Sequence, residues 1–188
     1  VPLLGNGEHV ATAVDLVQFG SSADGLNQPT DLAFNPAVPL ELWVTNQGDE
    51  SIVIYDQMGT DTRKATKYRG LENQHFLARP AGIAFGNNGF LATIHEQDQL
   101  TQGGFTPPDF MGPTMWSSDR SFFDAGHASH MDMLHNTPNG MGIAWERDNI
   151  YWVFDGAHNS LTRYNFNIDH GPGGTDHMDG VVERFVEG

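Results

Sequence analysis

Histidine residues are concentrated in one part of this chain. Six of the nine histidines fall between residues 127 and 177. Four candidate ligands lie within nine residues of one another: His127, His130, Asp132 and His135. Neutral imidazole and carboxylate groups suit zinc, iron, manganese or copper. We therefore treat this segment as one half of a candidate site for a divalent transition metal.

A second group follows about forty residues later, in a glycine-rich stretch. Its candidate ligands are Asp169, His170, Asp176, His177 and Asp179. The glycines between them let the chain fold back on itself, so these side chains are expected to converge. The carboxylates alone would suit calcium instead.

Neither group has the spacing of a standard metal motif. His-x-x-His-x-Asp-x-x-His is not a common zinc signature, and the acidic residues of 169–179 are not spaced as in an EF-hand. The alternative is that these are solvated loop residues that make turn hydrogen bonds.

Several other chemistries have no support in the sequence. The chain has no cysteine, which removes disulfides and thiolate ligands. It has no Gly-x-Ser-x-Gly motif and no glycine loop that would hold phosphate ahead of a helix. Whether the protein is an enzyme therefore stays open.

The net charge of the chain is −15, from 24 acidic and 9 basic residues. An acidic surface repels phosphate backbones and favours cations, so nucleic acid is not an expected partner. No apolar run approaches the ~18 residues of a membrane-spanning helix. The acidity, the missing cysteine and a start without methionine favour a periplasmic or extracellular location.

The elements that must position these residues are short repeated strands. The segment Pro29–Phe34 recurs as Pro80–Phe85 and again as Gly142–Trp145. Each copy is followed by a polar turn and a second apolar run, at 42–45, 90–94 and 150–154. Strand, turn, strand, turn, strand and an outer strand make one propeller blade. The sequence predicts an all-β fold, a β-propeller of four-stranded blades.

The repeat sets the expected boundaries within a single propeller segment, 1–188. We expect blades at about 27–70, 78–125 and 138–188, with a Pro/Gly-rich insertion at 101–118 in the second. The insertion would be a packed cap, a lid or a partner-binding loop. His95 ends a predicted second strand, where Asn46 and Asp155 stand in the other repeats, so it is either a turn cap or a metal ligand.

Two segments carry a resemblance to a known family. Phe19-Gly20 followed by residues 25–34 looks like the start of an NHL repeat, and residues 152–155 with 159–161 look like its second half. The resemblance covers three repeats over residues 19–188. The resemblance implies NHL-type blades and rings of about six blades. Three blades cannot close such a ring, since closed propellers have about 4 to 8. Either the chain is a piece of a longer protein that continues past Gly188, which is the expectation we favour, or a second copy or another protein chain completes the ring.

Three functions remain compatible with these observations. The first is a binding or scaffold module built on the propeller, with or without a His/Asp metal site. The second is a metal-dependent lyase or hydrolase; peptidyl-hydroxyglycine lyase propellers resemble NHL propellers, and that likeness implies a histidine-bound metal on the central axis. In that case His95, His135 and a residue of 169–179 would be its ligands. The third is a structural propeller stabilised by calcium at Asp169, Asp176 and Asp179.

Overall fold

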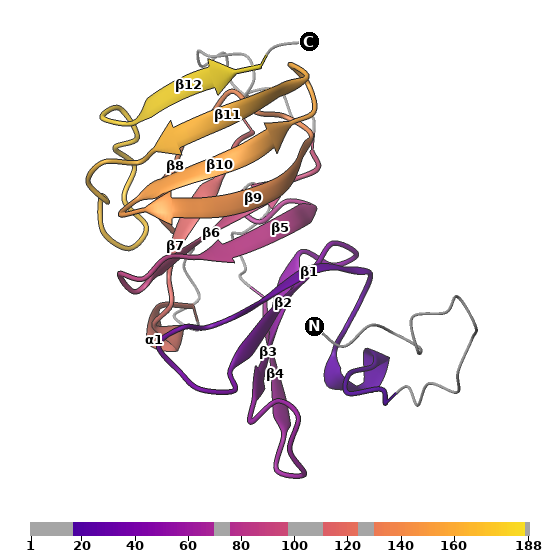
Figure 1. Ribbon diagram of the computed structural model, residues 1–188. Coiled ribbons are helices and arrows are strands. Elements are labelled where there is room, and N and C mark those ends of the chain that lie inside the picture. The colour runs from indigo at the N-terminus through magenta and orange to yellow at the C-terminus, as the bar shows by residue number, and fades with distance from the viewer. Residues whose placement is uncertain (1–16, 70–75, 98–110, 124–129, 187–188) are drawn as a thin grey trace, which may run out of the picture.

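The computed structural model describes residues 17–69, 76–97, 111–123 and 130–186. These residues form twelve strands in three four-stranded antiparallel sheets (Figure 1). The first sheet contains β1 (Pro29–Phe34), β2 (Leu42–Asn46), β3 (Ser51–Asp56) and β4 (Lys64–Tyr68). The second contains β5 (Pro80–Phe85), β6 (Phe90–His95), β7 (Thr114–Ser117) and β8 (His130–Met133). The third contains β9 (Gly140–Arg147), β10 (Ile150–Asp155), β11 (Ser160–Asn165) and β12 (Val181–Phe185).

Each sheet keeps its strands in chain order, as blades of a β-propeller do. The only helices among the described residues are short, η1 (Ser22–Asp24) and α1 (Arg120–Phe123). None of the described helices has the length and apolarity needed to cross a membrane. The prediction of an all-β propeller is confirmed.

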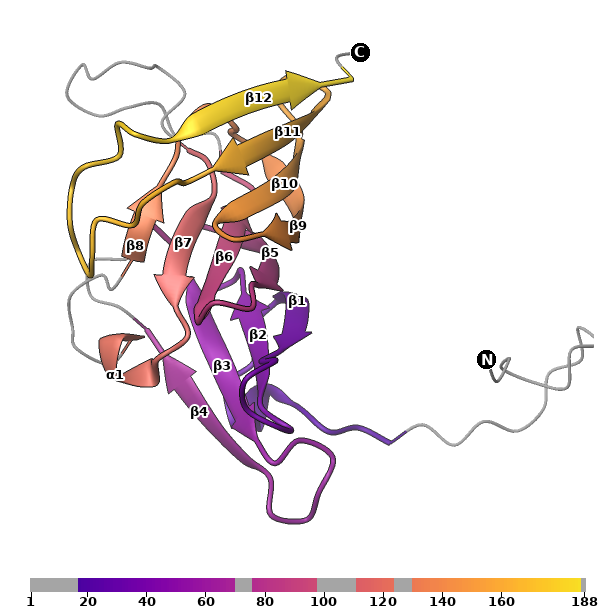
Figure 2. The same ribbon diagram turned by 60° about the vertical axis from the view of Figure 1, so that its left-hand side comes forward.

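The three sheets approach one another through their first strands. Strand β5 lies between β1 and β9, and the sheets fan outward from there to β4, β8 and β12 (Figures 1 and 2). Two hydrogen bonds join first strands directly. The Thr30 hydroxyl donates to the Pro80 carbonyl at 2.7 Å, and the Ile83 amide donates to Asp31 Oδ2 at 2.9 Å. The inner side of the arc is thus formed by β1, β5 and β9.

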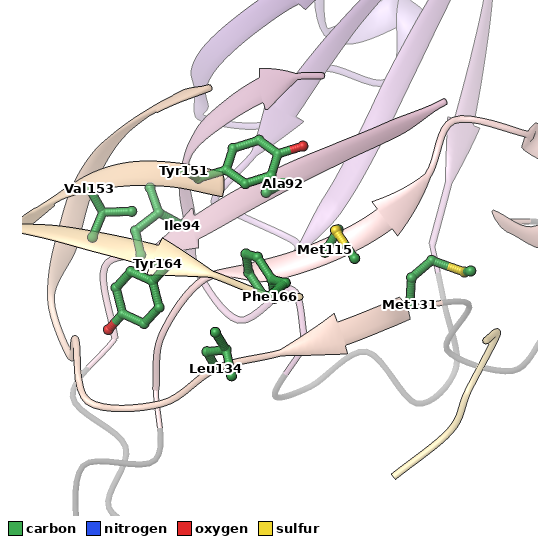
Figure 3. Packing of buried hydrophobic residues seen from close by; sticks show 9 residues of the cluster. All are labelled: Ala92, Ile94, Met115, Met131, Leu134, Tyr151, Val153, Tyr164 and Phe166. Atoms are coloured by element: carbon green, nitrogen blue, oxygen red, sulfur yellow. The ribbon is translucent and has the colours of Figure 1, made fainter. Parts of the chain in front are cut away.

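Alternation of side chains along each strand produces two apolar layers between the sheets. Trp43, Ile52 and Ile54 of the first sheet pack against a layer from the second that includes Ile83, Leu91 and Trp116. The opposite face of the second sheet packs against the third in the same way (Figure 3). That layer contains Ala92, Ile94, Met115, Tyr151, Val153, Tyr164 and Phe166.

Strand pairing fixes which positions of the three sheets are equivalent. Trp43 pairs with Ala33 and Ile54, Ala92 pairs with Ala84 and Met115, and Trp152 pairs with Ala144 and Arg163. These three positions therefore face the same way along the series of sheets. We call this direction forward, because it points from the first sheet toward the third.

The second sheet differs from the expected layout. Strand β7 occupies part of the range 101–118 that we expected to be an insertion, and β8 lies beyond the expected end at 125. Residues 98–110 lie outside the described residues. The flanking Gly112 and Pro113 made a four-residue strand resemble loop. Pairing with β6 and the complete burial of Met115 and Trp116 give it its place in the sheet.

Candidate metal centre

Three histidines from two sheets come together beside β8. His130 begins β8, while His170 and His177 lie in the loop that joins β11 to β12. One ring nitrogen from each lies within 4.8 Å of the other two. The ring of His130 is centred 4.9 Å from that of His170 and 5.7 Å from that of His177. Among the described residues, these histidines could hold a metal ion.

His130 lies where the pairing of β7 with β8 is irregular. Trp116 pairs with His130 and Met115 with Asp132, so the register skips Met131 between them. The ring of Phe76 stacks on that of His130, with centroids 3.6 Å apart and planes 18° apart. This stacking fixes the plane of the His130 ring.

The loop 166–180 reaches β8 because its backbone is bonded to that strand. The His170 amide donates to the Met131 carbonyl at 3.0 Å, and the Gly173 amide donates to the His130 carbonyl at 2.9 Å. Gly171 and Gly173 have φ values of 75° and 69°, a conformation that L side chains rarely adopt. The glycines therefore allow the tight fold that we expected to bring the ligands together.

Close contact between Gly174 and His170 also positions the site. A Cβ atom on Gly174 would lie 2.5 Å from His170 Nδ1 and 2.8 Å from its Cγ. The His170 ring occupies the space that any side chain at position 174 would need.

Asp132 is a buried carboxylate close to this group. Burial raises the pKa of Asp132 to about 7, and the charges of Asp179, Asp169 and Asp176 act in the same direction. Its Oδ1 accepts a hydrogen bond from the Met133 amide at 2.7 Å. Its Oδ2 is buried and has no hydrogen-bond partner among the described residues.

The three loop carboxylates accept backbone hydrogen bonds within the loop, those of Asp169 and Asp176 in tight turns and that of Asp179 across the loop. Asp169 accepts from the Gly171 amide, Asp176 from the Met178 amide and Asp179 from the Ile168 amide, at 3.1 to 3.3 Å. These bonds match the alternative that we left open for acidic residues in this loop. None of the three is part of the group of ring nitrogens.

The other histidine candidates that the structure describes are not part of the group of three. His95 is fully buried, with Nδ1 2.9 Å from the Gly112 carbonyl and Nε2 3.1 Å from the Thr93 hydroxyl. His135 has its ring centred 5.7 Å from that of His177, but it is not one of the three grouped histidines. His127 lies outside the described residues.

Sequence reasoning missed two features. Phe76 was not recognised as a neighbour of His130, and nothing local in the sequence links the two. The second is the forward face of the third sheet, which we call the open face. It consists of Trp152, Phe154, Leu161, Arg163, Glu183 and Phe185. The alignment of Trp43 with Trp152 was the signal that could have identified it.

Comparison with known proteins supports the fold only. No protein-family model and no curated protein matches the chain. A solved structure of a functionally unknown protein from Desulfotomaculum acetoxidans has a TM-score of 0.51 at 12% identity, covering 84% of this chain and 40% of that one. A virginiamycin B lyase from Staphylococcus aureus has a TM-score of 0.37 at 14% identity, covering 84% and 55%. The chain thus spans about half the length, or less, of these similar structures.

Proposed function

We propose that this chain is a binding and scaffold module of NHL-like propeller blades, and that its open face receives a further blade. The observation that carries the proposal is the equivalence of sheet positions. Trp43, Ile52 and Ile54 are completely buried against the second sheet. Their counterparts in the third sheet are Trp152, Leu161 and Arg163, which have no following sheet among the described residues.

The chemistry of the open face suits protein contact. Phe154 is 62% exposed and Phe185 is 43% exposed. The ring of Trp152 is centred 5.1 Å from that of Phe185. Aromatic side chains are enriched in the buried centres of protein interfaces. An exposed aromatic group of this kind favours a binding surface over an ordinary solvated face.

The charges on this face are already paired. Arg163 Nε donates to Glu146 Oε2, and its Nη1 donates to Glu183 Oε2, both at 2.8 Å. Trp152 Nε1 donates to the same Glu146 oxygen at 2.7 Å. A partner could therefore cover this face without leaving a lone buried charge, which would be costly.

A cavity of about 390 Å³ opens at the inner part of the open face. It lies between Asp31 of β1 and residues of the third sheet that include Ala144, Trp152 and Phe154. Its volume falls within the range of small-ligand pockets and would accommodate a large side chain of a partner. The cavity gives the proposed interface a place for an anchoring residue.

The expected partner is a blade from a second copy or from another chain. The opposite face of the first sheet is covered only in part. Leu26 packs against Leu42, Val44, Val53 and Tyr55 there, while Leu32 and Phe34 on the same face are 57% and 55% exposed. A second copy could therefore place this apolar face of its first sheet against the open face. A second copy is the partner that the purified chain itself can supply.

Sedimentation velocity over a range of protein concentrations tests this function. We expect the chain to self-associate as concentration rises and expect Phe154→Gln to weaken that association at least tenfold. Val38→Gln is the matched control, because Val38 is also an exposed apolar residue, at 42%, and lies in the loop between β1 and β2. A chain that stays monomeric throughout, or equal association of the two variants, would contradict the proposed interface.

The metal-dependent lyase or hydrolase is the alternative function, and the position of the histidines gives it less support. The resemblance to peptidyl-hydroxyglycine lyase implied a metal on the propeller axis. The three grouped histidines instead lie beside β8, the outermost strand of its sheet. Calcium stabilisation through Asp169, Asp176 and Asp179 also has less support, because each carboxylate accepts a local backbone hydrogen bond.

A further inference from the structure

We infer that His130, His170 and His177 bind a zinc-class transition metal, which fastens the loop 166–180 of the third sheet to strand β8 of the second. This inference does not depend on the open face. It assigns a structural role to the histidines, and it names zinc, or a metal of similar ligand preference, as the ion.

His170 is prepared to act as a ligand. Its Nδ1 lies 2.6 Å from the Gly171 carbonyl oxygen. A carbonyl can only accept a hydrogen bond, so Nδ1 must carry the proton and Nε2 must present its lone pair. That Nε2 is buried and has no hydrogen-bond partner among the described residues. A backbone carbonyl bonded to the opposite ring nitrogen is the usual arrangement for a histidine that binds metal.

The spacing of the nitrogens requires only a small contraction. Zinc binds imidazole nitrogen at about 2.0–2.1 Å, which places tetrahedral ligands about 3.4 Å apart. The three nitrogens already lie within 4.8 Å of one another. Side-chain rotations that move the ring nitrogens by about an ångström would therefore bring all three within bonding distance of one ion. The fourth tetrahedral position would remain available for water.

The ligand types and the local charge select the ion. Three imidazole nitrogens suit zinc, copper or nickel rather than calcium, which prefers oxygen. The carboxylates of Asp169, Asp176 and Asp179 lie close enough to Asp132 to act on it electrostatically. An acidic surrounding of this kind attracts a divalent cation.

The origin of the ligands gives the ion its structural role. His130 belongs to the second sheet, and both other histidines belong to a loop of the third. Two backbone hydrogen bonds join this loop to β8, at His170 and Gly173. A metal bound to all three side chains would add a cross-link at the outer side of the same contact. Opening of the loop would then require loss of the ion.

Zinc titration of the chelator-treated chain tests the site, with cobalt(II) absorption as a probe of tetrahedral coordination. We expect one ion per chain in the wild type. His170→Gln and His177→Gln are each expected to weaken binding at least tenfold. His158→Gln is the control, because His158 is bonded to Asp155 and lies outside the group. Unchanged zinc binding in both site variants would overturn the assignment.

Hydrogen exchange of the wild-type chain tests the fastening role separately and needs no variant. With zinc at 100 times its dissociation constant, exchange of amides in 168–178 should slow by about 100-fold. The melting temperature should rise by about 5–10 °C under the same conditions. The exposed turn at 57–63 should exchange at its original rate. If one zinc binds and the exchange of 168–178 does not change, the structural role is wrong even though the site exists.

Discussion

Replacing Trp43 should destabilise the chain far more than replacing Trp152, although the two occupy equivalent positions. Trp43 is fully buried, and its ring meets that of Phe85 edge-on at 5.5 Å. Truncating a buried tryptophan costs about 3–5 kcal/mol, and we expect that loss for Trp43→Ala. Trp43 Nε1 also donates to Glu41 Oε1 at 2.6 Å.

Loss of that hydrogen bond should add little to the cost. Glu41 Oε1 also accepts from Asn35 Nδ2 at 2.7 Å, and its Oε2 accepts from Arg120. The buried carboxylate therefore keeps partners after the substitution. The expected loss arises from the cavity and from the apolar contacts with the second sheet.

Trp152→Ala is expected to cost only about 1–2 kcal/mol, because part of its surface is already in water. Urea denaturation followed by far-ultraviolet circular dichroism measures both values, and an unchanged slope shows that the comparison is valid. Trp43→Phe provides a milder variant if Trp43→Ala does not fold. Equal losses at low protein concentration would refute the reasoning. A Trp152 loss that grows with protein concentration would indicate that a second copy covers the open face.

Two further substitutions test the positioning of the site and of the third sheet. Gly174→Ala should weaken zinc binding by about 10–100-fold without removing a ligand, because its Cβ would displace the His170 ring. Gly86→Ala is its control, since its Cβ would likewise meet a side chain, Asn88 Oδ1 at 2.8 Å, outside the histidine group, and zinc competition measures both. Asp155→Ala should lower the free energy of unfolding by about 3–5 kcal/mol, measured by urea denaturation. The reason is that Asp155 is buried and accepts hydrogen bonds from the Ala157 and His158 amides and from the Thr137 hydroxyl. A loss of stability below about 1 kcal/mol would contradict the role of this buried carboxylate in holding the third sheet.

The strands that the sequence predicted are those with strong local signals. β1, β5 and β9 share a repeated motif, and β2, β6 and β10 follow polar turns, so alternation and turn residues were sufficient. β7 and β8 have only four residues each. Their assignment depends on pairing with β6 and with each other. Such pairing is a non-local property that a single sequence does not reveal.

The same limit applies to the candidate ligands. Composition identified His130, His170 and His177 among ten candidates but could not separate them from His95. Their selection depends on the irregular pairing of β8 at His130 and on the backbone bonds that join the loop to β8. His95 resembles a ligand in the alignment, yet the Gly112 carbonyl and the Thr93 hydroxyl lie beside its two ring nitrogens.

The two proposals meet in the third sheet. The loop 166–180 carries His170 and His177 and leads directly into β12, which places Phe185 on the open face. Among the described strands, β12 is paired only with β11, so the position of its start depends on that loop. An ion that fixes the loop would therefore also fix one edge of the open face. Since coupling between two binding events is reciprocal, a partner that binds this face more tightly in the presence of zinc must raise zinc affinity by the same factor.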